Sequence, residues 1–317
     1  MTTADSLAQL IPEAAAFLKS RVRRTPVEHS PALSKILGVP IWLKLESMQL
    51  TGSFKIRGAM FRLSKLTPEE RREGVVTCSA GNHGKAVAYA AREQGARATI
   101  CVPKSVDRSK YEAMLALGAD VRVSEFEGYD QTEEWSRALA AEQGRTFISP
   151  FDDYAVMAAN GGTVALEVME DVPFARAFIV PVGGGGLAAG FAFAAKPATI
   201  IGCQHVLSPA LQMSLIAGRA ITKLPAVETL ASGVEGGIGE MTFGVLGPLV
   251  GRVALVSEDE ILEGVRWMLS CHQYLIEPTA AVTIAACISG KIGPLQHPAV
   301  VVVSGRNVSI DTIKRIV

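Results

Sequence analysis

The chain has 317 residues, of which 49% are hydrophobic and 20% are charged, as in a folded globular protein and unlike a disordered or fibrous one. Its 31 basic residues equal its 31 acidic residues, so no overall charge attracts nucleic acid or an anionic membrane surface. Five widely spaced cysteines predict neither a disulfide framework nor a CxxC metal site, and no apolar run reaches the roughly 20 residues of a membrane span.

The first residues read as a polar start followed by an amphipathic helix. They lack the basic, apolar and small-residue segments that follow one another in a secretory signal peptide. We therefore expect a cytoplasmic protein that binds neither nucleic acid nor membrane. The length exceeds that of one typical domain, which predicts two lobes.

From Val75 onward, short apolar runs alternate with helix-like stretches. Strands are expected at 75–79, 98–102, 120–123 and 146–148, with helices at 85–94, 105–117 and 129–143 between them. A second series has strands at 178–182, 198–203, 253–256 and 300–303, with helices that begin at Leu187 and Ser208. This alternation predicts an α/β protein with two mostly parallel sheets. Thr67 and Ser257, each with a glutamate three residues later, predict helix starts with capping boxes.

The first candidate for chemistry is Lys55, which follows small or polar turn residues and precedes an apolar-periodic segment. A lysine whose ammonium is desolvated loses its proton more readily and becomes a nucleophile toward an aldehyde. A solvated surface lysine is the alternative, and this segment taken alone favours that alternative.

The second candidate is the glycine run 183–186, which follows an expected strand and precedes the helix that begins at Leu187. Consecutive backbone N–H groups at a helix N-terminus bind phosphate. No Gly-Lys-Ser/Thr follows, so the run is not a Walker loop. A dinucleotide site would have an acidic residue about 20 positions later, where Cys203 and Gln204 stand. The run therefore predicts a site for one phosphate, with a glycine turn that binds nothing as the alternative.

Two further segments lie where strands are expected to end. The turn from Ser79 to His83 offers backbone donors, a hydroxyl and an amide to a second small anion, such as a substrate carboxylate. For His83, a structural imidazole that fixes the loop is favoured over acid–base work. Ser304 ends the apolar strand at 300–303, and residues at the carboxyl end of a parallel strand line the ligand crevice. Its alternative role is to cap the next turn.

Taken together and in chain order, these segments resemble the fold-type II pyridoxal-phosphate (PLP) enzymes, in particular the serine/threonine ammonia-lyase (threonine dehydratase) and serine racemase branch. The resemblance covers nearly the whole chain. It implies a two-lobed α/β fold like that of tryptophan synthase β, in which each lobe is a mostly parallel sheet flanked by helices. Residues 1–50 and 148–317 would form the large PLP-binding domain, and residues 51–147 a small domain that closes over the substrate.

The same resemblance implies roles for the candidate residues. Lys55 would hold PLP as a Schiff base and act as the catalytic base at the substrate Cα. The residues implied in cofactor binding are Phe54, Lys55, Asn82, Gly183, Gly184, Gly185, Gly186, Leu187, Glu277 and Ser304. The residues implied in substrate binding are Ser79, Ala80, Gly81, Asn82 and His83. A neutral hydroxyl at the pyridine nitrogen, supplied by Ser304, makes the ring a weaker electron sink and suits prompt loss of a β-leaving group.

The implied activity is elimination of water from a small 3-hydroxy amino acid, with release of a 2-oxo acid and ammonia. Threonine- or serine-like substrates, 3-hydroxyaspartate and phenylserine all remain open. A racemase or a β-replacement enzyme of the same fold is the alternative, although Ala80 stands where the racemases carry a second serine and His83 where cysteine synthases carry threonine. A non-catalytic binding protein on this scaffold would lose Lys55 or the 79–83 turn. Relatives of this length are usually homodimers, which predicts the same here.

Three departures from the family pattern stand out. Metal-dependent relatives carry carboxylates after the strand that ends at Cys203, whereas this chain has Gln204 there, so no Mg²⁺ or Ca²⁺ site is predicted. Ser232 replaces an aspartate that precedes glycine. Arg306 replaces the second glycine of the usual Ser-Gly-Gly-Asn, and its guanidinium favours a second substrate carboxylate, as in 3-hydroxyaspartate. An arginine that faces solvent or pairs with Glu277 or another acid is the alternative.

Overall fold

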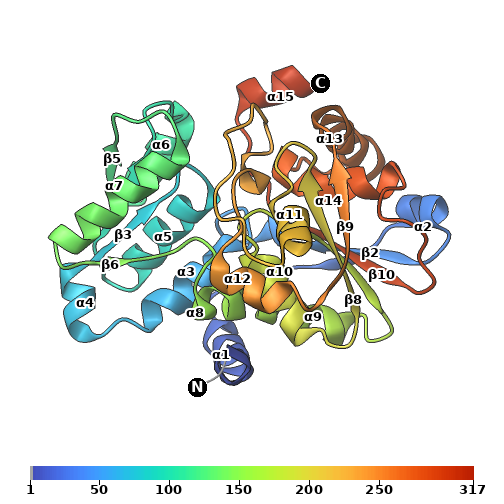
Figure 1. The fold of residues 1–317 in the computed structure, drawn as a ribbon, viewed down its shortest axis with the longest axis horizontal. Helices are drawn as coiled ribbons and strands as arrows, with labels where there is room; N and C mark the ends of the chain where they lie inside the picture. Colours follow the sequence, from blue (N-terminus) through green and yellow to red (C-terminus); the bar gives the residue numbers. More distant parts are fainter. Residues whose placement is uncertain (1–2) are drawn as a thin grey trace.

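A computed structural model describes residues 3–317. The chain forms two sheets, each flanked by helices, in two lobes that lie side by side (Figure 1). This arrangement agrees with the α/β class and the two mostly parallel sheets expected from the sequence. No helix within residues 3–317 has the length and apolar content needed to cross a membrane.

The larger sheet has six strands in the order β1-β2-β10-β7-β8-β9. All neighbours in it are parallel except β1 and β2. The strands span Val27–His29 (β1), Ile41–Leu45 (β2), Ala177–Pro181 (β7), Thr199–His205 (β8), Val250–Val256 (β9) and Ala299–Val303 (β10). β7 and β10 are fully buried apolar runs, which is typical of a parallel sheet covered by helices on both faces.

The smaller sheet has four parallel strands in the order β5-β4-β3-β6. They span Val75–Cys78 (β3), Ala98–Val102 (β4), Asp120–Val123 (β5) and Thr146–Phe147 (β6). α3 (Lys55–Ser64), α5 (Asn82–Glu93) and α6 (Arg108–Leu115) pack against one face, and α7 (Tyr129–Glu142) packs against the other. The crossover helices expected between these strands are therefore present.

Helices also cover both faces of the larger sheet. One face packs against α2 (Pro31–Leu37), α13 (Glu258–His272) and α14 (Pro278–Ile288). The other packs against α1 (Thr3–Leu18), α9 (Thr163–Asp171), α10 (Gly186–Ala194), α11 (Ala210–Ala217) and α12 (Glu240–Leu246). The remaining helices are α4 (Pro68–Glu73), α8 (Tyr154–Met157) and α15 (Ile310–Ile316), with short turns at Glu46–Met48, Ala158–Gly162 and Ser232–Val234. Both predicted capping boxes are confirmed, at Thr67 for α4 and at Ser257 for α13.

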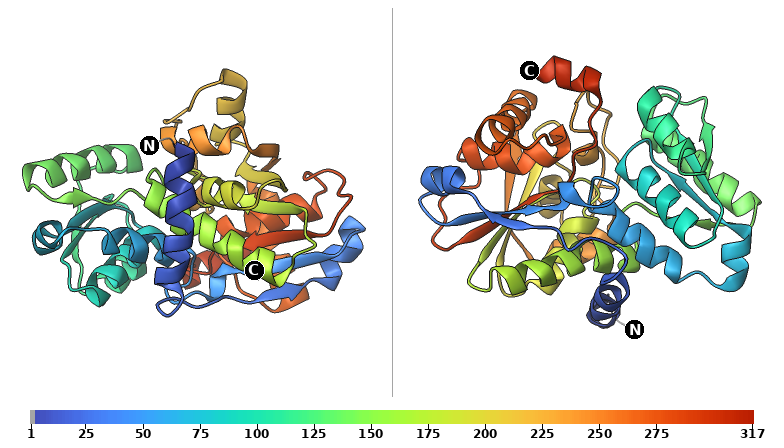
Figure 2. Two further views of the ribbon diagram at one scale, coloured as in Figure 1. Left: turned by 90° about the horizontal axis from the view of Figure 1, so that it is seen from below. Right: turned by 180° about the vertical axis from the view of Figure 1, so that it is seen from behind.

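The junction between the lobes is built from three packed segments. α1 runs across it and contacts helices of both lobes (Figure 2). A π-helical turn at Ala158–Gly162 joins α8 to α9, and α10 packs closely on this turn. A Cβ on Gly190 of α10 would lie 1.9 Å from the carbonyl oxygen of Met157, so only glycine permits this approach. The contact fixes α10, and with it the loop that precedes it.

Candidate active site

Lys55 is the first residue of α3, directly at the junction between the lobes. The N–H of Phe54 donates to the carbonyl oxygen of Ser304 (3.2 Å), which holds the start of α3 against the end of β10. Lys55 Nζ donates to the carbonyl oxygen of Pro150 (2.7 Å). Burial lowers the pKa of Lys55 to about 8, against an opposing effect of the Glu277 carboxylate. A large fraction of the amine is therefore neutral near pH 8, as a nucleophile or base requires.

The turn from Ser79 to His83 connects β3 to α5. The helix begins at Asn82 and not at Lys85, so the sequence-based start was three residues late. Gly81 is the N-cap and makes no side-chain cap, because glycine has none. The first-turn N–H groups of α5 consequently have no partner within the helix, and such groups can bind an anion. Ser79 Oγ accepts the N–H of Gly81 (3.2 Å), and Ala80 offers no polar group.

His83 is buried within this turn, with 3% of its surface exposed. Its Nε2 lies 3.3 Å from the carbonyl oxygen of Ile148. Burial, together with the nearby Lys55, lowers the pKa of His83 to about 3, against the opposing effect of the hydrogen bond with the Ile148 carbonyl. The imidazole is therefore neutral at physiological pH, which fits a structural or hydrogen-bonding group.

We expect this neutral imidazole to make stability depend on pH. Unfolded His83, at its ordinary pKa of 6.5, takes up a proton as the pH falls below that value, whereas folded His83 does so only near pH 3. The free energy of unfolding should thus fall by about 1.4 kcal/mol per pH unit in this window from His83 alone. Urea denaturation between about pH 7 and pH 5 should show a shallower slope for His83→Gln than for the wild type. His297→Gln, at an exposed histidine, is the control, and equal slopes for all three proteins would contradict a neutral His83.

The glycine loop follows β7 and leads into α10, which begins at Gly186. Gly185 has φ 93°, a left-handed conformation that favours glycine. A Cβ on Gly184 would lie 2.3 Å from the ring of Phe151. No side chain caps α10, so the N–H groups at the start of this helix are available to a phosphate.

Ser304 and Glu277 come from the C-terminal part of the chain and contact the residues beside Lys55 and in the 79–83 turn. Ser304 directly follows β10, and its Oγ is buried without a hydrogen-bond partner among residues 3–317. Glu277 precedes α14, and its backbone N–H donates to the carbonyl oxygen of Gly305 (3.2 Å). Burial raises the pKa of Glu277 to about 7, although Asn82 Nδ2 donates to its Oε1 (2.7 Å) and opposes the shift.

The segment at 148–151 brings these residues together, and the sequence did not single it out. The carbonyl of Ile148 faces His83, that of Pro150 accepts from Lys55, and Phe151 packs against Gly184. The segment follows β6, the edge strand of the smaller sheet, at its carboxyl end. Its place directly after a strand is the one sequence signal that could have identified the 148–151 segment, because ligand sites form where parallel strands end.

The two unusual residues, Ser232 and Arg306, are both exposed. Ser232 begins a short helical turn, and the N–H of the next residue, Gly233, donates to Thr279 Oγ1 (3.0 Å). The backbone N–H of Arg306 donates to the carbonyl oxygen of Gly52 (2.9 Å). The Arg306 side chain forms no hydrogen bond or ion pair within residues 3–317, so the suggested pairing with Glu277 is not found.

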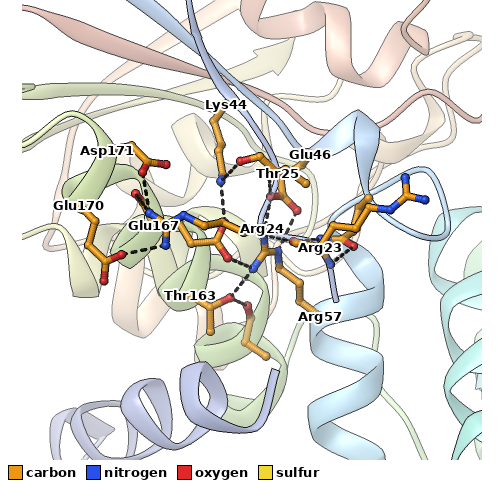
Figure 3. A network of polar contacts seen from close by, with 12 residues as sticks. Arg23, Arg24, Thr25, Lys44, Glu46, Arg57, Thr163, Glu167, Glu170 and Asp171 are labelled. Atoms are coloured by element: carbon orange, nitrogen blue, oxygen red, sulfur yellow. Dashed lines mark hydrogen bonds and ion pairs between the residues drawn. The ribbon is translucent and has the colours of Figure 1, made fainter. Parts of the chain in front are cut away.

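A buried ion-pair network supports the first turn of α3 through Arg57, which lies two residues after Lys55 (Figure 3). Arg57 contacts Glu46 (2.8 Å) and Glu167 (2.7 Å), and Glu167 also contacts Lys44 (2.6 Å). Arg57, Glu46 and Lys44 are at most 1% exposed. Burial disfavours the Arg57 cation, but the two carboxylates outweigh it and hold the pKa of Arg57 above its ordinary value. Two cations and two anions balance, so this network joins α3 to β2 and α9 without net buried charge.

Comparisons with known proteins identify the family. Residues 18–305 match the family described as pyridoxal-phosphate dependent enzyme. An L-threonine ammonia-lyase of Geobacter sulfurreducens is 38% identical over 97% of this chain and 77% of its own length. The structures of a maize serine racemase and of a processed threonine deaminase from Solanum lycopersicum are both 32% identical. They have TM-scores of 0.89 and 0.90, and they cover 97% and 98% of this chain and 95% and 92% of their own. The chain therefore belongs to the pyridoxal-phosphate dependent enzymes.

Proposed function

We propose that this chain is a PLP-dependent ammonia-lyase that eliminates water from a small 3-hydroxy amino acid. The observation that carries the proposal is the convergence of a lysine of lowered pKa, an uncapped glycine loop and an unpartnered serine hydroxyl at one junction. The products are a 2-oxo acid and ammonia. The identity to threonine ammonia-lyases over most of the chain supports this activity over other PLP chemistry.

The residues at the junction fit PLP. Lys55 would bind the aldehyde carbon, and the N–H groups of the loop at 183–187 would hold the phosphate. Ser304 Oγ, which has no hydrogen-bond partner in the described part of the chain, would face the ring nitrogen. Asn82 would reach the ring hydroxyl, with Phe54 beside the lysine, and Glu277 would line the same pocket. When bound, PLP supplies an electron-withdrawing ring that stabilises negative charge at the substrate Cα.

The chain's own residues would then bind the substrate and move protons. The N-terminus of α5, from Ser79 to His83, would hold the substrate carboxylate through backbone N–H groups. Lys55 Nζ would take the proton from Cα as a general base, for which its lowered pKa is suited. Ala80 has no group that could return a proton to Cα from the opposite face. Elimination is therefore favoured over racemisation.

A direct experiment separates these outcomes. The PLP-loaded protein is incubated with L-serine, L-threonine and 3-hydroxyaspartate, and the 2-oxo acid, ammonia and D-amino acid are measured together. We expect equal amounts of 2-oxo acid and ammonia with little D-amino acid. Predominant D-amino acid, or product only when an external thiol is added, would instead favour a racemase or a β-replacement enzyme.

The glycine loop gives a second prediction. Gly185→Ala should lower the free energy of unfolding by about 1 kcal/mol, because the backbone at φ 93° disfavours a side chain. It should also weaken PLP binding by roughly tenfold, the equivalent of one lost hydrogen bond to the phosphate. Gly218→Ala is the matched control: it also has a left-handed φ (66°), and a Cβ there meets nothing within 4 Å. Titration with PLP should distinguish the two variants, and equal affinities would argue against the phosphate role.

The last residues of β8 and the segment after it predict independence from divalent cations. Gln204 Oε1 accepts the N–H groups of Leu211 (3.0 Å) and Gln212 (3.2 Å), and Ser208 Oγ accepts the N–H of Gly236 (2.9 Å). These oxygens are used within the protein, and a carboxamide carries no charge for a hard cation. EDTA should leave 2-oxo acid formation unchanged, and added Mg²⁺ or Ca²⁺ should not raise the melting temperature. A loss of activity on chelation would show that a cation takes part.

The quaternary structure, location and domain motion complete the proposal. By resemblance, the protein acts as a homodimer in the cytoplasm, and its five free cysteines are consistent with a reducing compartment. Residues 51–147 are the domain that closes over the substrate, against the large domain at 1–50 and 148–317. Light scattering would test the dimer, and a smaller radius of gyration in the presence of a bound dicarboxylate would support closure.

A further inference from the structure

Three cations lie near the predicted substrate site. Lys85 and Arg306 form no ion pair among the described residues, whereas Lys110 acts on the carboxylate of Asp107 as well as on that of Glu277. We refer to Lys85, Lys110 and Arg306 as the cationic rim. Lys85 lies one turn into α5, Lys110 lies in the first turn of α6, and Arg306 follows β10. Both lysines act electrostatically on Glu277, which couples them to the same pocket.

Lys85 is tied to the predicted substrate-binding turn by a chain of hydrogen bonds. Its Nζ donates to Asn307 Oδ1 (3.0 Å), and Asn307 Nδ2 donates to Asn82 Oδ1 (2.6 Å). Asn82 Nδ2 in turn donates to Glu277 Oε1 (2.7 Å). Asn307 Nδ2 also donates to the carbonyl oxygen of Thr51, four residues before Lys55. The Lys85 ammonium is therefore held at the edge of the candidate active site.

Arg306 lies close enough to Lys85 for the two cations to repel each other. Burial lowers the pKa of Lys85, Arg306 lowers it further, and Glu277 opposes both. The Arg306 side chain is exposed, and no described carboxylate pairs with it, whereas its backbone is anchored to Gly52. Since Glu277 has a pKa of about 7, it neutralises at most part of this charge near neutral pH. An anionic ligand would relieve the repulsion.

We infer that the substrate carries a second carboxylate, which Arg306 binds together with Lys85. The inference rests on the proposed function and narrows its substrate to a 3-hydroxy dicarboxylic amino acid, such as 3-hydroxyaspartate. The α-carboxylate binds at the start of α5, and Lys85 stands one turn further along that helix, roughly 5 Å away. A short dicarboxylate can therefore reach both ends of this arrangement. The planar guanidinium of Arg306 provides two parallel donors for the second carboxylate.

The test compares the rates of two substrates, 3-hydroxyaspartate and L-threonine, in the wild type and in variants of the cationic rim. The ratio of kcat/KM for 3-hydroxyaspartate to that for L-threonine is measured for the holoenzyme, for Arg306→Gln and for Lys85→Gln. We expect the wild type to prefer 3-hydroxyaspartate, and the ratio to fall roughly 10- to 100-fold in Arg306→Gln, with a decrease also in Lys85→Gln. Arg315→Gln, at an exposed arginine on α15, is the matched control and should keep the wild-type ratio.

Each outcome decides a separate point. An unchanged ratio in Arg306→Gln, or turnover of threonine with no preference for 3-hydroxyaspartate, overturns the inference and leaves the ammonia-lyase proposal standing. If no 3-hydroxy amino acid is turned over, the proposed function fails. In that case, calorimetric titration of the holoenzyme with malonate and acetate still tests whether the cationic rim binds a second carboxylate. Tighter binding of malonate that is lost in Arg306→Gln supports the inference, and equal binding of malonate by both proteins overturns it.

Discussion

Replacement of Lys55 by alanine is expected to lower 2-oxo acid formation by on the order of 10³-fold or more, because it removes both the amine that would hold the cofactor and the base at Cα. The variant should still fold. An ammonium that is buried enough to lower its pKa to about 8 disfavours the folded state at neutral pH, so its replacement by alanine removes this cost. Steady-state rates of 2-oxo acid formation with L-threonine and 3-hydroxyaspartate measure the loss.

Lys65→Ala provides a matched control for this prediction. Lys65 caps the C-terminus of the same helix and pairs with Glu13 at the surface. Its replacement should leave the rates near those of the wild type. Substantial activity in Lys55→Ala, with bound PLP, would assign the catalytic amine to another residue.

Replacement of Arg57 by leucine should lower the free energy of unfolding by about 3–5 kcal/mol, the cost of leaving a buried ion without its partner. In the variant, Glu46 would be buried without a compensating cation, and Glu167 would keep only Lys44 (Figure 3). Urea denaturation of the PLP-loaded protein measures this loss.

Two further variants test whether the loss of stability in Arg57→Leu comes from the buried ion that is left without a partner. Arg24→Leu removes ion pairs with Glu170 and Asp171 in which the arginine side chain is 49% exposed, and it should cost less than about 1 kcal/mol. The double variant with Arg57→Leu and Glu46→Leu removes one charge of each sign and should lose less stability than Arg57→Leu alone. Equal losses in Arg24→Leu and Arg57→Leu would contradict the account.

The repeating pattern of strand, turn and helix was readable from the sequence because parallel sheets covered on both faces need continuous apolar strands. β3, β4 and β10 lie within a residue of the expected ranges for this reason. The predicted start of α5 was less accurate. Gly81 and Asn82 read as turn residues, but Gly81 serves as the N-cap and Asn82 begins the helix.

The residues that meet at the junction could be listed from the sequence, but not the contacts between them. Lys44 alternates with apolar residues in β2 and reads as solvent-facing. It is buried because α9 covers that face and brings Glu167 to it, which no local pattern indicates. The link from Lys55 to the glycine loop through Pro150 and Phe151 likewise depends on how the two sheets pack.

The central claim is that Lys55 holds PLP at this junction, and reductive trapping tests it most directly. The PLP-loaded protein is reduced with borohydride, digested, and its peptides are analysed by mass spectrometry. The account predicts the phosphopyridoxyl group on the peptide that contains Lys55 and on no peptide of the Lys55→Ala variant. Modification of a different lysine, or equal modification of both proteins, would contradict it.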